Sequence, residues 1–330
     1  MKKIIYIAGA LMLLFPALSS AQALSYTAAE TDAASLGTAG ANLTQTHSIA
    51  GAAFSNVAAV PFSDVKFDAA AGFTMWQPAA IKSNMINVGA AYNMKNKLGV
   101  AFGFMYGMNP AYDVTDASGA VKGQFKPSDI SVNAGFAYRF IENLSVGANI
   151  GYATSSLAEG YSYGALAADV FAMAKFNSFK VTAGVANIGT AVTSKSGAKF
   201  SLPTSAAIGA GYEAVFAEKH SIDVLLDADY YFMGAFAAAA GATYTFDDMV
   251  SVRAGYRYGG NSPLRSYASV GAGVKFAGVK LDLAYMLSAS VFLFSFSQCR
   301  QENTKAKLAK LINVLSCHPF ARLKFFTSFT

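Results

Sequence analysis

The fold of this chain is decided by one stretch, Met249-Val250-Ser251-Val252-Arg253-Ala254-Gly255-Tyr256-Arg257-Tyr258-Gly259. Successive side chains of a β-strand point to opposite faces. One face here is therefore apolar and ends in two tyrosines, and the other carries Arg253 and Arg257. A soluble protein would bury the apolar face in a core, whereas a membrane barrel turns that face to lipid and keeps the charged face in its lumen. The recurrence of the pattern along the chain decides between these two structures.

The same alternation recurs in 13 segments after the N-terminal region, at residues 65–76, 83–94, 97–107, 129–140, 143–154, 164–176, 178–188, 204–216, 220–233, 236–246, 249–259, 266–276 and 278–287. Most are about 10 residues long, which is the length that a tilted strand needs to cross a bilayer. Links such as 141–142 and 247–248 are short, whereas 108–128 and 189–203 are long. We therefore predict an all-β transmembrane β-barrel of about 14 antiparallel strands, because bacterial single-chain barrels close with an even number. Thirteen strands are convincing and the last is poor or missing.

The composition also favours a membrane barrel and argues against nucleic acid as a partner. Of 330 residues, 54% are hydrophobic and 13% are charged, against about a quarter charged in soluble domains. No run after the N-terminus reaches the roughly 18 apolar residues of a membrane helix. Of the 25 basic residues, six lie in 291–330 and two at the N-terminus, and one of the 19 acidic residues lies in 291–330. The body, 22–290, thus keeps 17 basic and 18 acidic residues and offers no basic surface.

The N-terminal region predicts export. Lys2 and Lys3 precede an apolar run at 4–18, so we expect a signal peptide over 1–21, cleaved near Ala21 and Gln22. Residues 22–64 are rich in Ala, Thr, Ser and Gly and lack a period of two. We interpret them as a plug inside the barrel, with a flexible leader as the alternative. We expect the barrel in the outer membrane of a Gram-negative bacterium, with outer-membrane lipid and the barrel-assembly machinery as partners.

The C-terminal region has a different character. The alternating pattern ends near Ser290, so we place the barrel at 65–290 and treat 291–330 as an atypical tail. One interpretation of the tail is a basic amphipathic helix on a membrane surface. The other is a frameshift that replaces the natural last strand, in which case Val291 to Phe296 form at best a poor fourteenth strand.

No group of residues indicates catalysis, a metal site or a cofactor. His47 and His220 are the only histidines of the body, and neither has a partner at metal-ligand or triad spacing. Both cysteines, Cys299 and Cys317, lie in the tail, which excludes a disulfide scaffold in the body. We expect neither an enzyme nor a cofactor.

One cluster of side chains is predicted, a luminal charge network. Its expected members are Arg139, Asp227, Asp229, Arg253 and Arg257. Because buried charges need partners, we expect Arg253 and Arg257 to face acids on the strand at 220–233. A catalytic carboxylate pair at Asp227 and Asp229 is the less favoured alternative.

Several motifs, taken in order, resemble the PorV/PorQ family of Bacteroidota outer-membrane proteins, relatives of the FadL-type fatty-acid channels. They include Ser35-Leu36-Gly37-Thr38-Ala39-Gly40, Val185-Ala186-Asn187-Ile188-Gly189 and Val252-Arg253-Ala254-Gly255-Tyr256-Arg257, although Val57 departs from the family's Asn-Pro-Ala element. The resemblance implies a 14-stranded barrel with an N-terminal plug. It also implies a component or adaptor of type IX-like protein secretion or surface attachment, with secretion components or secreted proteins as partners. The alternative is FadL-like transport of a hydrophobic ligand, because a plug of small residues can leave an apolar pocket.

Overall fold

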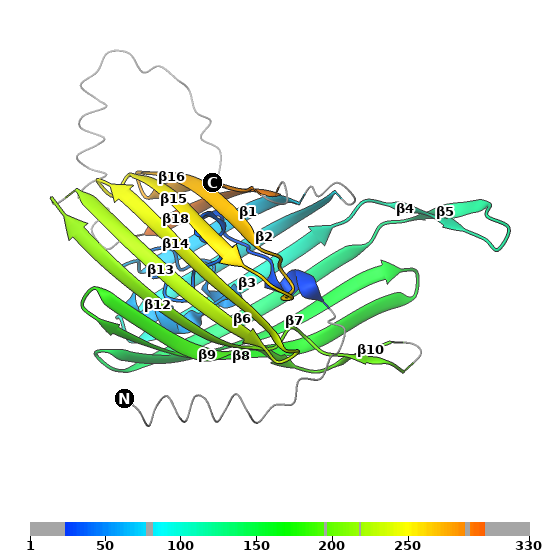
Figure 1. The fold of residues 1–330 in the computed structure, drawn as a ribbon, viewed down its shortest axis with the longest axis horizontal. Helices are drawn as coiled ribbons and strands as arrows, with labels where there is room; N and C mark the ends of the chain where they lie inside the picture. The colour runs from blue at the N-terminus through cyan, green and yellow to red at the C-terminus, as the bar shows by residue number, and fades with distance from the viewer. Residues whose placement is uncertain (1–23, 77–81, 195–196, 218, 288–290, 301–330) are drawn as a thin grey trace, which may run out of the picture.

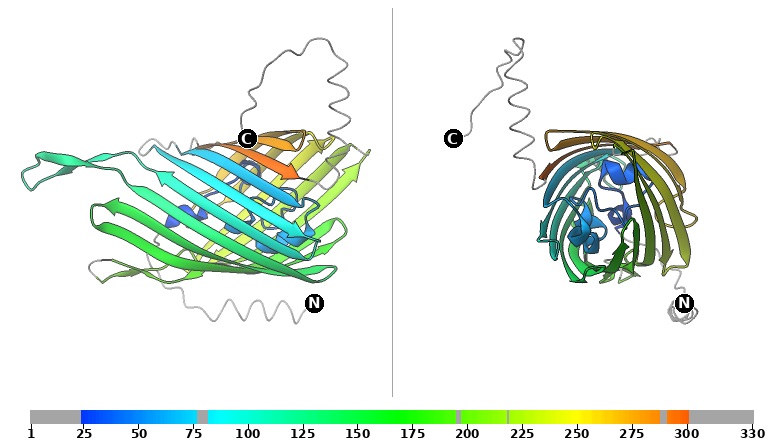
Figure 2. Two further views of the ribbon diagram at one scale, coloured as in Figure 1. Left: turned by 180° about the vertical axis from the view of Figure 1, so that it is seen from behind. Right: turned by 90° about the vertical axis from the view of Figure 1, so that its left-hand side faces the viewer.

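The structure is a computed structural model that describes residues 24–76, 82–194, 197–217, 219–287 and 291–300. It is a closed antiparallel barrel whose tilted strands surround the N-terminal segment (Figure 1 and Figure 2). The expected signal peptide at 1–21 and the tail beyond Arg300 lie outside the described residues.

The wall follows the order of the chain. Its strands are β1 (Phe67–Trp76), β2 (Ser83–Met94), β3 (Leu98–Met108), β6 (Ser128–Ile141), β7 (Leu144–Ala158), β8 (Tyr161–Phe176), β9 (Phe179–Gly189), β12 (Ser205–Phe216), β13 (His220–Tyr231), β14 (Ala235–Phe246), β15 (Val250–Tyr258), β16 (Tyr267–Phe276), β17 (Val279–Met286) and β18 (Val291–Arg300). Each of the 13 predicted segments coincides with one of the strands from β1 to β17 in this wall. The predicted architecture is therefore confirmed.

The last strand closes the barrel. β18 pairs antiparallel with β17 on one side and with β1 on the other, in registers that place residue 292 opposite Tyr285 and residue 294 opposite Phe73. A closed wall leaves no strand edge with unpaired backbone groups in lipid. The barrel therefore continues for the 10 residues of β18 beyond the boundary expected at residue 290.

The two faces of each strand separate as the alternation predicts. In β15, Tyr256 and Tyr258 are 54% and 51% exposed on the outside, whereas Arg253 and Arg257 are 7% and 5% exposed on the inside. Apolar side chains of the other strands are exposed in the same way, among them Phe136, Ile150, Leu166, Ile208, Leu226 and Val274. The outer surface therefore suits lipid, and the polar residues face the lumen.

None of the helices within the described ranges has the length and apolarity needed to cross a membrane.

The two ends of the barrel differ. Tight turns join β8 to β9 and β14 to β15 at one end, where Asn177, Asp247 and Asp248 adopt positive φ of 51°, 52° and 54°, a conformation that Asn and Asp tolerate better than most residues. The opposite end carries the longer connections. One of them is the hairpin of β4 (Tyr112–Thr115) and β5 (Val121–Phe125), which extends beyond the barrel in Figure 1. Another contains β10 (Val192–Thr193) and β11 (Lys199–Phe200).

The N-terminal segment, residues 24–64, lies in the lumen and is called the plug below (Figure 2). It contains η1 (Ser25–Ala28), α2 (Ala33–Gly37), η2 (Ala52–Phe54) and η3 (Val57–Phe62). The carboxylate of Asp32 caps α2 by accepting from the Ser35 N–H, and the side chain of Asn56 caps η3 by accepting from the Ala58 N–H. α2 packs against β16 and β17, and η3 packs against β3, β6 and β7.

The closure of the wall leads to a first prediction. A chain that ends at residue 290 lacks the partner of both β1 and β17 and should fail to form a stable barrel, because two strand edges would face lipid unpaired. A chain that ends at Arg300 should fold. Barrel formation is measured by the mobility of unheated and heated samples on detergent gels. Equal folded fractions for the two chains would contradict the assigned role of β18.

Candidate functional site

Arg257 of β15 reaches across β14 to an acid of β13. Its Nη2 donates to Asp229 Oδ2 at 3.1 Å and to the hydroxyl of Tyr231 at 3.3 Å. The β14 residues opposite Asp229 and Arg257 are Ala237 and Ala239, and these small buried side chains leave room for the guanidinium to cross. Two of the residues expected in a luminal charge network are thus in contact.

The sequence predicts that Arg253 pairs with an acid of β13, and this prediction is wrong. Arg253 pairs instead with Asp282 of β17. Its Nη1 lies 2.7 Å from Asp282 Oδ1, and its Nη2 donates to Ser251 Oγ at 2.9 Å. The contact crosses β16 at Gly273, where a Cβ would lie 2.2 Å from Asp282 Oδ1. The sequence reasoning missed Asp282, although it has the inward parity of its strand and could have been found by that signal.

Wall carboxylates hold the plug by its backbone. Asp227 Oδ2 accepts from the N–H groups of Asn42 at 2.7 Å and Leu43 at 2.9 Å. Asp68 of β1 accepts in the same way from the N–H groups of residues 49 and 50, at 2.9 and 3.1 Å. These bonds satisfy amides of the irregular plug that no secondary structure pairs.

Arg139 lies apart from the other expected members of the network, at the end with the tight turns. Its Nε donates to the carbonyl of Glu142 at 2.8 Å. Its guanidinium carbon lies 4.9 Å from the centre of the Phe62 ring, which fits a cation–π contact with the plug. The five expected residues are therefore divided among several places on the wall.

The two histidines of the body occupy opposite sides of the wall. His47, in the plug, lies 3.2 Å from Glu213, and the neighbouring pair of Lys180 and Asp223 is also 3.2 Å apart. His220 joins an outward-facing aromatic group, in which its ring stacks on Phe216. In the part of the chain that the structure describes, no group of three or more His, Cys, Asp or Glu could hold a metal ion.

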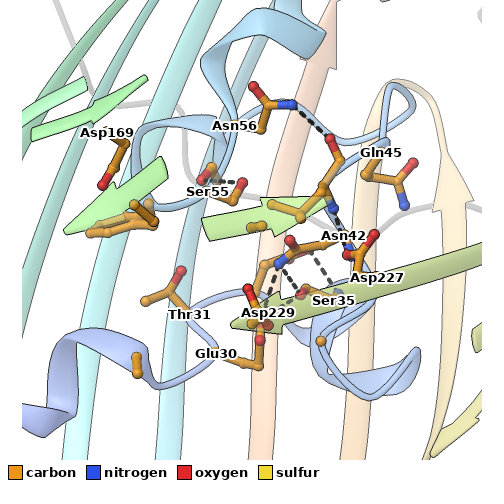
Figure 3. A pocket seen from close by; sticks show the side chains of 18 of the residues that line it. Glu30, Thr31, Ser35, Asn42, Gln45, Ser55, Asn56, Asp169, Asp227 and Asp229 are labelled. Carbon is orange, nitrogen blue, oxygen red and sulfur yellow. Dashed lines mark hydrogen bonds between the residues drawn. The ribbon is translucent and has the colours of Figure 1, made fainter. Parts of the chain in front are cut away.

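A cavity of about 150 Å³ lies between the plug and the wall (Figure 3). Its polar lining includes Glu30 and Asp32 of the plug and Asp169 of β8. Phe54 and Phe171 line an apolar part. The cavity thus differs from the apolar pocket expected between a barrel and a plug of small residues, because the inward positions of the wall carry polar side chains.

Two acids of the plug, Glu30 and Asp32, are half-buried. Glu30 accepts from the hydroxyl of Ser35 and, at 3.1 Å, from Nδ2 of Asn42. Burial raises the pKa of Glu30, although the bond from Ser35 opposes the rise. Burial also raises the pKa of Asp32, and the nearby charge of Asp282 adds to that effect. The plug therefore carries carboxyl groups that hold protons more tightly than they would in water.

No protein-family model and no curated protein matches this chain. Solved structures do resemble it. The toluene transporter TodX of P. putida has 13% identity and a TM-score of 0.54, over 77% of this chain and 94% of that one. The toluene transporter TbuX of Ralstonia pickettii has 9% identity and a TM-score of 0.55, over 81% and 97%. A Pseudomonas aeruginosa FadL homologue has 13% identity and a TM-score of 0.52, over 82% and 98%.

At these identities, the comparisons show the fold alone. They support a barrel fold of the FadL type, which the sequence resemblance implies. The resemblance to the PorV/PorQ family stays a prediction.

The contact between Asp227 and the plug leads to a second prediction. Asp227→Ala leaves the amides of Asn42 and Leu43 without an acceptor, at about 1–3 kcal/mol for each buried amide. Hydrogen exchange of a peptide covering 40–45 should become at least about 10-fold faster, while the barrel stays folded. The matched control is Asp129→Ala, because Asp129 accepts from Asn109 and Ser155 and not from the plug. Equal exchange in the two variants would contradict this role of Asp227.

A third prediction follows from the raised pKa of Glu30. The folded chain binds this proton more tightly than the unfolded chain, so the Glu30 contribution to stability is full below the ordinary value of 4.5 and is lost as the pH rises through the raised pKa. Glu30→Gln should flatten the fall of the urea midpoint between pH 4 and 8. Asp116→Asn is the control, because hydrogen bonds led by that from Ser118 lower the pKa of Asp116 to about 2. A midpoint with the same pH dependence in wild type and Glu30→Gln would contradict the prediction.

Proposed function

We propose that this protein is an outer-membrane channel for small hydrophobic molecules, and not an enzyme. The observation that carries the proposal is the filled lumen. A closed barrel with an apolar exterior holds its own N-terminal segment inside, and a cavity remains between that segment and the wall. Two of the similar solved structures are described as toluene transporters, which supports the choice of cargo class.

The plug is the gate in this proposal. Asp227 and Asp68 each hold the plug through two backbone N–H groups, and not through a continuous strand pairing. Each such bond contributes roughly 0.5–1.5 kcal/mol net, or about 1.5–3 kcal/mol where the acceptor is charged. A short part of the plug can therefore detach without opening the wall, whose hydrogen bonds form one closed ladder. A displaced plug would join the cavity to the ends of the lumen.

The proposed location is the outer membrane of a Gram-negative bacterium. The apolar outer face fits contact with membrane lipid, and the barrel-assembly machinery would insert the chain. Export would use the signal peptide expected at 1–21, which lies outside the described residues.

A fourth prediction tests this function. Cells with a lipopolysaccharide outer leaflet should take up radiolabelled toluene several-fold faster when they carry the protein. A plug lock joins Ala41 of the plug to Ala239 of β14, which belong to one buried cluster. Both are replaced by cysteine, in a chain whose native cysteines are replaced by serine. Once mass spectrometry shows the bond, oxidation should reduce uptake to the level of control cells, and reductant should restore it.

The matched control for the lock is the single variant Ala41→Cys, which cannot form the bond. Toluene uptake that is equal with and without the protein would overturn the proposed function. Uptake that persists with the bond formed would exclude the plug as the gate.

The protruding hairpin favours a second candidate, the adaptor of type IX-like secretion that the PorV/PorQ resemblance implies. β4 and β5 stand clear of the barrel (Figure 1) and expose Tyr112, Val114 and Val121. A protein bound at this end would bury these side chains. The uptake experiment separates the candidates, because an adaptor would leave toluene uptake at the level of control cells.

A further inference from the structure

We infer that the cavity between plug and wall binds the ammonium group of a small organic amine. This inference rests on the proposed channel function and adds to it a preference, among small hydrophobic molecules, for those with a positively charged end.

The lining has more negative than positive groups. Its carboxylates are Glu30, Asp32, Asp169, Asp227 and Asp229, and its one cation is Arg257. Arg257 is already paired with Asp229 at 3.1 Å. Among the residues that the structure describes, no Lys, Arg or His forms an ion pair with any of the other four. Hydrogen bonds from the plug and the wall reach these carboxylates, but no cation of the described ranges does. Since a buried carboxylate without a cationic partner is unfavourable, the cavity favours a guest that brings positive charge.

Asp227 supplies a second, independent indication. It is 6% exposed and lines the cavity. Its Oδ2 accepts the two plug amides, and its Oδ1 is buried without a hydrogen-bond partner among the described residues. Buried carboxylate oxygens are normally satisfied. An ammonium group, with three N–H donors, is suited to this lining.

Figure 3 shows four of the acidic groups around one space. Asp227 and Asp229 enter it from β13, Glu30 enters from the plug, and Asp169 enters from β8 at the other side. The carboxylates therefore come from both the moving part and the fixed part of the proposed channel. A cation among them would also link the plug to the wall.

The size and the apolar part of the cavity define the rest of the ligand. A volume of about 150 Å³ matches apolar cavities that hold benzene. Leu43, Phe54 and Phe171 provide an apolar surface for one ring or a short alkyl chain. A hydrocarbon of the same size would leave four of the five carboxylates without a cationic partner. A bare metal ion fits poorly, because the described residues include no group of three or more His, Cys, Asp or Glu that could hold one.

Protonation of the carboxyl groups is the competing explanation. Burial favours the neutral form of Glu30 and Asp32. If the acids of the cavity are all neutral, the lining has no preference for a cation, and toluene binds as well as an amine of the same size. The two explanations therefore differ in a binding experiment.

The fifth prediction compares benzylammonium with toluene, its uncharged analogue of nearly equal size. The full chain, folded in detergent micelles, is titrated with each at pH 7 by calorimetry. Benzylammonium should bind at least about 10-fold more tightly, which corresponds to about 1.4 kcal/mol of binding free energy. Asp169→Asn should weaken benzylammonium at least about 5-fold and leave toluene unchanged. An amide at this position can still accept the N–H of Asn187, which now lies 2.7 Å from Asp169 Oδ1.

The matched control is Asp129→Asn, an inward acid of β6 that does not line the cavity, and it should leave both affinities unchanged. Gel mobility confirms that each variant is folded. Equal binding of benzylammonium and toluene, or an unchanged benzylammonium affinity in Asp169→Asn, overturns the inference. Such a result leaves the channel function standing, since toluene uptake by cells is measured separately. Conversely, selective amine binding without protein-dependent uptake of toluene would overturn the function and leave the amine site standing.

Discussion

The structure depends on one constraint, the closure of the backbone hydrogen-bond ladder between β1 and β18. In lipid, an unpaired N–H or C=O group costs several kcal/mol, so a sheet with two free edges is not viable there. Closure fixes which side of every strand is inside, because side chains alternate strictly along a paired strand. The exposed tyrosines and buried arginines of β15 follow from that single condition.

A closed wall also creates a space that the chain must fill. The inward faces carry charges, and these need partners within the lumen. Small residues on two strands let the arginines reach acids two strands away. Arg257 crosses the alanines of β14, and Arg253 crosses the glycines of β16. The wall acids Asp227 and Asp68 instead find donors on the plug, whose irregular backbone has free N–H groups. The plug therefore supplies hydrogen-bond donors to the wall acids, and the wall acids supply acceptors to the plug amides.

The sequence predicts the strands from their period of two, but it does not predict which side chains and backbone groups bind each other inside the barrel. Thirteen strands follow from alternation, because each strand shows its two faces within its own ten or so residues, and the fourteenth follows from the even strand number of bacterial barrels. The partner of Arg253 does not, since it depends on the stagger between β15 and β17 and not on parity alone. The plug contacts are hidden for another reason. Asp227 binds backbone N–H groups of residues 42 and 43, which every sequence possesses, so no residue type marks the site.

The fold and the cargo depend on different features of the barrel. A fold hosts many functions, and the lining of the site selects among them. A pocket for pure hydrocarbons requires apolar side chains at inward positions, against the alternation that a barrel otherwise shows. Here, that departure is partial. Phe171 is an apolar inward residue of β8, yet Asp169, two residues before it, stays acidic. A molecule that satisfies both neighbours must carry an apolar body and a polar or charged end, although the wall around it resembles that of toluene transporters.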